Sequence, residues 1–150
     1  MSLKQQLDQD LKTAMLAGEK QTVTVLRGLK GAVLNVEIQN GSREQGLSDE
    51  EVLTVLAKES KKRQESADMY RQGNSPERVE AELAEKEIID KYLPQQMSEQ
   101  DLETIIKRVI LERGALNMQA MGQVVGAVKQ EVGGQADGGR IAQKVKELLT

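Results

Sequence analysis

The chain has 150 residues, which allows one or two small domains that each bury a modest core. It contains no cysteine, histidine, tryptophan or phenylalanine, so thiolate and imidazole ligands for zinc are absent, and Ser–His or Cys–His nucleophile systems cannot be built. The formal net charge is −3, from 21 basic and 24 acidic side chains, and this balance gives no overall electrostatic attraction for nucleic acid.

The sequence also bears on location. The first ten residues are polar and lack the apolar centre of a signal peptide, and no apolar run approaches the roughly 20 residues that span a bilayer. The absence of cysteine fits a reducing compartment. We therefore expect a cytoplasmic protein with no bound metal or cofactor and no membrane partner.

Helical periodicity runs through the whole chain, because apolar residues recur at spacings of three and four and no segment alternates as a strand would. Ser2 and Gln5 form a predicted capping box that opens a first helix, which Gly18 ends. A second helix is predicted from about Glu19 to Asn40. The residues expected to be buried are Leu3, Leu7, Leu11, Ala14 and Met15 in the first helix and Val23, Leu26, Leu29, Val33 and Val36 in the second.

A loop, Gly41–Gly46, precedes the third predicted helix, which Ser48 opens with a second capping box. This helix extends to about Arg71. Its second half has few apolar residues, so we expect that end to project into solvent. Ser75 and Pro76 predict the N-cap and first position of a fourth helix. The apolar residues of these two helices are Val52, Leu53, Val55, Leu56, Ala67, Met69 and Tyr70, then Val79, Leu83, Ile88, Ile89 and Tyr92.

A domain boundary is predicted near the proline at position 94. Leu93 precedes Pro94, and helical backbone is disfavoured for a residue that precedes proline. Ser98 is then predicted to begin a new helix. We therefore predict an all-α fold with an N-terminal four-helix domain, residues 1–94, and a C-terminal three-helix bundle, residues 95–150.

The second domain contains three predicted helices, of which Gly114 ends the first, Asn117 caps the second and Asp137 caps the third. Gly122 and Gly126 lie four residues apart inside the second of these helices, a spacing that predicts close approach of a neighbouring helix. Basic and acidic side chains balance at seven each. The residues expected in the second core are Leu102, Ile105, Ile106, Val109, Ile110, Met118, Met121, Val125, Val128, Val132, Ile141, Val145 and Leu148.

The segment GGQADGGRIAQKVKELL, residues 133–149, raises the question of a nucleotide phosphate loop. Gly133 and Gly138 have the spacing of GxxxxGK[ST], but Gly139 stands where the lysine belongs and Arg140 where the hydroxyl residue belongs. No strand precedes the segment, so the strand–loop–helix framework is also missing. The sequence therefore argues against a nucleotide phosphate loop.

Two interpretations of this segment stay open. In the first, the glycines form a tight corner and Asp137 caps the last helix. In the second, the free amides at the start of that helix, flanked by Arg140, Lys144 and Lys129, receive a backbone phosphate of RNA without any nucleotide-binding fold.

The densest basic run is KESKKRQES, residues 58–66. The acidic Glu59 and Glu65 interrupt it, which favours a solvated helix face, with an RNA contact or a partner-protein surface as alternatives. Acidic clusters at residues 49–51 and 80–87 are typical of charged helix surfaces rather than of metal sites. With only two tyrosines, base stacking is not expected as a principal binding mode. The cations of the basic run are Lys58, Lys61, Lys62 and Arg63.

Five segments, taken together, form a pattern specific enough to indicate a protein family. They are VLRGLKGAVLNVEI (25–38), KESKKRQES (58–66), EIIDKYLPQQMSE (87–99), MGQVVGAVK (121–129) and ADGGRIAQKVKELL (136–149). With them the chain resembles the YqeY-like family over essentially its whole length. Its second half also resembles the C-terminal tail of the B subunit of the glutamine-dependent Asp/Glu-tRNA amidotransferase, GatB. The resemblance implies an all-helical, two-domain fold with a three-helix tail domain.

In that amidotransferase the tail helps to hold tRNA, while kinase and amidase chemistry lies in other domains and another subunit. The resemblance therefore implies tRNA binding, or assistance to tRNA-dependent amidation. A family label of carbon–nitrogen ligase with glutamine as amido-N-donor follows from the same homology, but the residues give no independent support for catalysis, and no catalytic residue is predicted. The positions that the resemblance singles out are Lys129, Gly134, Ala136, Asp137, Gly138, Arg140 and Lys144.

Three hypotheses follow. The leading one is a non-catalytic helical module whose C-terminal domain binds tRNA or assists a tRNA-linked amidotransferase. The second is an adaptor that binds partner proteins through the exposed half of the third helix. The third is an amidotransferase-type ligase component that acts only together with partner subunits.

Overall fold

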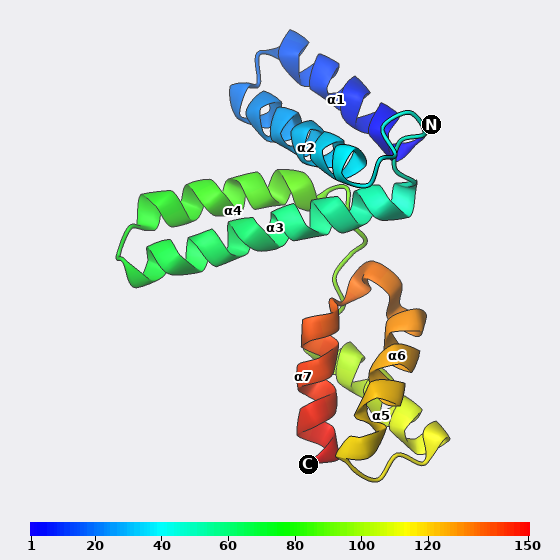
Figure 1. The fold of residues 1–150 in the computed structure, drawn as a ribbon. Coiled ribbons are helices and arrows are strands. Elements are labelled where there is room, and N and C mark those ends of the chain that lie inside the picture. Colours follow the sequence, from blue (N-terminus) through cyan, green and yellow to red (C-terminus); the bar gives the residue numbers. More distant parts are fainter. The chain divides into compact units, whose positions relative to one another are not determined.

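The computed structural model describes all residues from Met1 to Thr150 and contains seven α-helices and two short 3-10 helices, with no strand. The predicted all-α fold is thus confirmed. The chain forms two compact units, Met1–Leu93 with helices α1 to α4 and Pro94–Thr150 with helices α5 to α7, as Figure 1 shows for each unit. The predicted arrangement of four helices followed by three is also confirmed.

The helix ends of the first unit follow the predicted signals. Helix α1 (Leu3–Ala17) begins with the capping box of Ser2 and ends at Gly18, whose φ of 73° is left-handed. Helix α2 (Lys20–Gln39) follows, and Ser48 opens α3 (Asp49–Gln72) with its own capping box. Helix α4 (Pro76–Asp90) starts with its proline as predicted, but Ser75 makes no capping hydrogen bond through its side chain.

The core of the first unit takes residues from all four helices and from the loop before α3. Met15 was predicted to be buried and is 52% exposed, whereas its neighbour Ala14 is buried as predicted. Val23 and Val36 lie at the edge of the core and are only partly buried. The buried residues of this core are Leu7, Leu11, Val25, Leu26, Leu29, Val33, Leu47, Val52, Val55, Leu56 and Ile89.

The second half of α3 corrects one prediction, since it does not project alone into solvent. It packs along α4 as a helical hairpin, visible in Figure 1. Ala67 is fully buried, and the buried hydroxyl of Ser60 donates a hydrogen bond to Asp90. At the loop end of the hairpin, the Arg78 guanidinium lies 5.5 Å from the centre of the Tyr70 ring. Small and polar side chains therefore make the contact that the apolar pattern did not reveal.

One buried carboxylate joins three parts of the first unit. Glu37 on α2 is 3% exposed, and its Oε2 accepts hydrogen bonds from Lys4 Nζ at 2.7 Å and from the backbone N–H of Leu47 at 2.9 Å. The hydrogen bond from Lys4 holds the pKa of this carboxyl below its ordinary value, against the opposing effect of burial. Elsewhere in this unit, the Tyr92 hydroxyl donates a hydrogen bond to Asp10, and burial raises its pKa.

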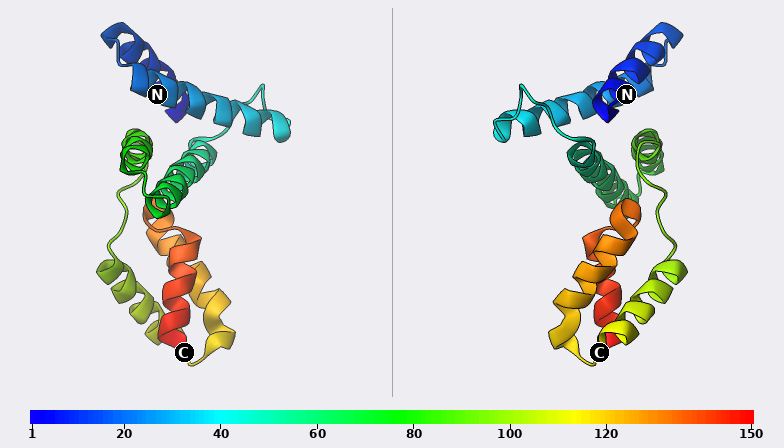
Figure 2. Two further views of the ribbon diagram at one scale, coloured as in Figure 1. Left: turned by 90° about the vertical axis from the view of Figure 1, so that its left-hand side faces the viewer. Right: turned by 90° about the vertical axis from the view of Figure 1, so that its right-hand side faces the viewer.

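The second unit is a three-helix bundle, shown in two further views in Figure 2. Ser98 caps α5 (Glu99–Arg113), Gly114 ends it in a left-handed conformation, and a 3-10 turn, η1 (Met118–Ala120), precedes α6 (Met121–Val132). A second 3-10 turn, η2 (Gly133–Gln135), leads to α7 (Gly138–Leu149). The buried residues of this core are Leu102, Ile106, Val109, Ala115, Val124, Val128, Val132, Ala136, Ile141 and Val145.

The start of α6 departs from the predicted pattern. Asn117 caps the turn η1 rather than α6, by accepting a hydrogen bond from Gln119 N at 3.0 Å. Val124, which was not predicted, is fully buried, whereas the predicted Val125 is only partly buried and Met118 is 39% exposed. The prediction for Gly122 and Gly126 was also wrong, because a Cβ at either position would meet nothing within 4 Å.

Candidate functional site

The corner between α6 and α7 contains most of the positions singled out by the sequence. Gly133 has φ 57° and ψ −129°, a conformation open to glycine and strained for other residues. Ala136 is extended and only 3% exposed, so it belongs to the core of the second unit. The Asp137 side chain caps α7 by accepting a hydrogen bond from Arg140 N at 2.8 Å. The glycine-rich segment is therefore a structural corner with its own internal cap.

Gly134 lies at this corner for a steric reason. A Cβ on Gly134 would lie 3.2 Å from Pro94 Cγ, tighter than an ordinary contact. The side chain of Gln96 donates a hydrogen bond to the carbonyl of Gly134 at 3.2 Å, and Met97 N donates to Gln135 O at 2.8 Å. The corner thus holds the segment that leads into α5.

Three cations surround the start of α7. Arg140 is half-buried and donates hydrogen bonds to the carbonyl of Met97 at 2.8 Å and to Glu99 through Nη2 at 2.8 Å and Nε at 3.1 Å. Lys144 Nζ lies 3.8 Å from Glu99 Oε2 and 3.4 Å from Glu147 Oε2. Lys129, which makes no ion pair, places its Nζ 3.9 Å from the point where a Cβ on Gly138 would lie. The fold therefore brings Lys129, from another helix, to the first turn of α7.

Glu99 is the residue of this site that sequence reasoning missed. It occupies the first position of α5, about 40 residues before its partners, and no local pattern indicates that it will face α7. Its side chain is 65% exposed, while those of Arg140 and Lys144 are 28% and 20% exposed. Ion pairs this close to solvent contribute at most about 1 kcal/mol each, so an external anion can compete with the carboxylate.

The basic run on α3 is divided by the fold. Arg63 is half-buried against α4, with its Nε 2.9 Å from Glu85 Oε2 and 3.9 Å from Glu82 Oε2, although this nitrogen has no aligned hydrogen-bond partner. Lys62 pairs with Glu59 on the same helix at 3.3 Å. Lys58 and Lys61 are exposed and make no ion pair, and Lys58 lines a groove between α2 and α3. Arg63 thus joins α3 to α4, while the three lysines face outward.

No group of three or more acidic side chains comes together in an arrangement that could hold a metal ion. None of the helices combines the length and apolar content that a membrane crossing needs. What the α6–α7 corner offers chemically is a set of cationic donors and the first amides of a helix, which suit an anion.

Comparison with models of known protein families shows which family the chain belongs to. The model described as Yqey-like protein matches residues 4–149. The chain belongs to the YqeY-like family. A relative in Clavispora lusitaniae (strain ATCC 42720), named "Altered inheritance of mitochondria protein 41, mitochondrial", is 34% identical over 84 residues, which are 56% of this chain and 47% of that protein. The chain thus matches about half the length of this relative, and the resemblance to the YqeY-like family noted from the sequence is confirmed.

Proposed function

We propose that this member of the YqeY-like family is a non-catalytic helical module that binds tRNA through the corner between α6 and α7. The observation that carries the proposal is a group of three cations along the first two turns of α7, with the Lys129 ammonium next to Gly138 and with Arg140 and Lys144 both at Glu99. Cationic side chains and free helix amides are the groups that contact phosphate oxygens of nucleic acid.

The internal pairing with Glu99 sets the strength of this binding. A phosphate must displace the carboxylate from Arg140 and Lys144, and the second unit carries no excess positive charge to attract RNA from a distance. The proposal therefore entails modest, salt-sensitive affinity rather than tight binding to any RNA. Among the other singled-out positions, Gly134 and Ala136 act through packing, Asp137 through capping, and Gly138 by leaving room for the Lys129 ammonium.

In tRNA-dependent amidation, a module of this kind would hold the tRNA while partner subunits perform the chemistry. The resemblance of the second unit to the tail of the amidotransferase B subunit supports this role. A cytoplasmic location, favoured by the absence of cysteine, is part of the same proposal.

The test is a titration of fluorescent tRNA with the full chain at several salt concentrations. With three phosphate contacts, log K should fall with log[salt] with a slope of about −2 to −3. The variant Lys129→Gln/Lys144→Gln should bind more weakly and lose about two units of that slope. Charge reversal in Arg140→Glu/Lys144→Glu should abolish measurable binding, with circular dichroism to verify that the bundle is still folded.

The matched control is Lys107→Gln/Lys146→Gln. Both lysines are exposed and lie in the same unit, and the substitution changes the net charge by the same amount. This control should bind tRNA nearly as well as the wild type. If Lys107→Gln/Lys146→Gln weakened tRNA binding as much as Lys129→Gln/Lys144→Gln does, the attraction would be non-specific and the proposal would be overturned. Wild-type protein that binds no tRNA at low salt would also overturn it.

A further inference from the structure

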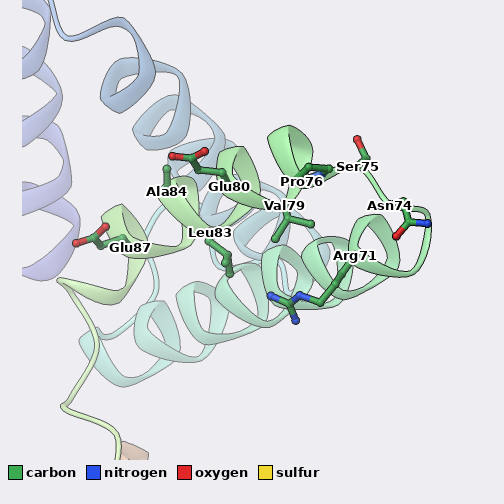
Figure 3. Close-up of a pocket in the computed structure, with 9 residues that line it drawn as sticks. All are labelled: Arg71, Asn74, Ser75, Pro76, Val79, Glu80, Leu83, Ala84 and Glu87. Carbon is green, nitrogen blue, oxygen red and sulfur yellow. The ribbon is translucent and has the colours of Figure 1, made fainter.

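A groove at the loop end of the α3–α4 hairpin belongs to neither the α6–α7 corner nor the basic run of α3. It has a volume of about 830 Å³, and its apolar lining comes from α4, with Val79, Leu83 and Ala84. Pro76 closes one end, and Arg71 of α3 lies opposite α4 (Figure 3). The groove is therefore an apolar strip along the first three turns of α4.

The apolar strip is incompletely covered by the first unit itself. Val79 and Leu83 are only half-buried, although they point from α4 toward the α3 side of the groove in Figure 3. Ile89, at the other end of the helix, is fully buried in the core. The part of α4 that runs from Pro76 to Glu87 therefore leaves apolar side-chain surface accessible in the groove.

The rim of the groove carries uncompensated negative charge. Glu82 and Glu85 lie near Arg63, whereas Glu80 and Glu87 are exposed and make no ion pair. In Figure 3 their carboxylates point away from α3, on the same side of α4 as Ala84.

The cation on the opposite rim is already balanced. Arg71 Nη1 lies 3.2 Å from Asp68 Oδ1 on the same helix. An apolar lining with two unpaired acidic groups on one rim repels phosphate and favours a partner with apolar and cationic side chains.

We propose that this groove binds an amphipathic helix of a partner protein, with apolar residues facing Val79 and Leu83 and lysine or arginine residues facing Glu80 and Glu87. The segment Pro76–Glu87 is about 16 Å long at 1.5 Å per residue, which accommodates three turns of a partner helix. Helices that dock in this way present apolar residues at positions i, i+4 and i+7. The groove and the α6–α7 corner lie in different units, so this proposal does not depend on RNA binding.

The experiment uses the full-length protein and two designed 18-residue peptides. Both carry leucine at the same helical spacing, and they differ only in having lysine or glutamate at the flanking positions. Backbone amide shifts in NMR spectra locate the binding, and fluorescence anisotropy of labelled peptide gives the affinity. The lysine peptide should shift amides between Val79 and Glu87, whereas the glutamate peptide should not.

Charge reversal tests the rim without disturbing the core. The variant Glu80→Lys/Glu87→Lys should weaken binding of the lysine peptide about tenfold or more at low salt and should gain affinity for the glutamate peptide. The control Glu44→Lys/Glu65→Lys changes the net charge equally at exposed positions outside the groove and should leave both affinities nearly unchanged.

Three outcomes would overturn the proposal. The first is equal weakening by the control, and the second is an absence of shifts in the groove at about 1 mM peptide. The third is a set of concentration-dependent shifts in the groove without peptide, together with sedimentation as a dimer. That result would assign the groove to a second copy of this chain.

Discussion

The buried carboxylate of Glu37 offers a quantitative test of the first unit. We expect Lys4→Met to destabilise the unit, because Glu37 is 3% exposed and would keep only the hydrogen bond from the Leu47 amide. Loss of one partner of a fully buried pair costs about 3–5 kcal/mol. Since Lys4 is 40% exposed, solvent already screens part of this interaction, and we expect a cost of about 1–2 kcal/mol at neutral pH.

The pH dependence of this cost has a defined direction. Lys4 lowers the pKa of Glu37 in the folded state, so the stabilisation is fully present above the ordinary carboxyl pKa of about 4.3 and is lost as the pH falls through the lowered value. The difference in unfolding free energy between wild type and Lys4→Met should therefore be constant near neutral pH and should shrink in acid.

Urea denaturation followed by tyrosine fluorescence is a suitable assay. The protein has no tryptophan, and both of its tyrosines, Tyr70 and Tyr92, lie in the first unit, so the signal reports on that unit alone. In the Glu37→Gln background, Lys4→Met should cost about 1 kcal/mol less than in the wild type. The control Lys12→Met, an exposed lysine of the same helix without an ion pair, should change stability by less than about 0.5 kcal/mol. Equal costs in both backgrounds would refute the reasoning.

Four further substitutions test other features, all by urea denaturation monitored with circular dichroism. Gly133→Ala should destabilise the second unit by about 1–3 kcal/mol, because Gly133 has a positive φ. Gly126→Ala, at an open helical position, should instead stabilise the unit by about 0.5–1 kcal/mol. Stability changes of the same sign in both variants would contradict the different backbone conformations assigned to the two glycines. Tyr92→Phe should cost about 1 kcal/mol through loss of the hydrogen bond to Asp10. Because the pKa of Tyr92 is raised in the folded state, the stabilisation from its hydroxyl is fully present below pH about 10 and is lost as the pH rises further. The unfolding free energy of Tyr92→Phe should therefore fall less at alkaline pH than that of the wild type. Ile141→Ala should cost about 2–5 kcal/mol through a cavity in the second core, and a matching shift in the tyrosine fluorescence transition would contradict the separation of the two cores.

The elements that the sequence predicted well are those determined by local chemistry. Ser2 and Ser48 make their capping boxes, and Gly18 and Gly114 end helices in the left-handed conformation that glycine adopts at low cost. Strongly periodic apolar positions such as Leu26, Leu29 and Ile106 are buried as expected.

The errors arise where tertiary contacts use residues without an apolar signal. The hairpin of α3 and α4 depends on Ser60 and on the ion pair of Arg63 with Glu85, neither of which stands out from a solvated helix face in the sequence. It also depends on Ala67, whose small side chain is a weak apolar signal. Likewise, Val124 and Val125 both fit a helical spacing with the buried Val128, and only the packing of the three helices makes Val124 the fully buried one.

The candidate site likewise contains some interactions that the sequence could predict and others that it could not. Asp137 could be predicted as a cap, because its position before a helix determines the interaction. The pairing of Glu99 with Arg140 and Lys144, and the approach of Lys129 to Gly138, join residues from different helices. Such contacts depend on how the helices pack, and that information lies outside any short sequence window.

Ile89 lies in the last helix of the first unit, and this position has a consequence for synthesis of the protein on the ribosome. This fully buried residue completes a core to which Leu7 contributes from the first helix. A nascent chain that has exposed only α1 to α3 still lacks it, so apolar side chains such as Leu26 and Leu56 stay incompletely covered during most of translation. The first unit thus closes only after α4 has emerged, and until then the growing polypeptide exposes apolar surface of the kind that leads to aggregation.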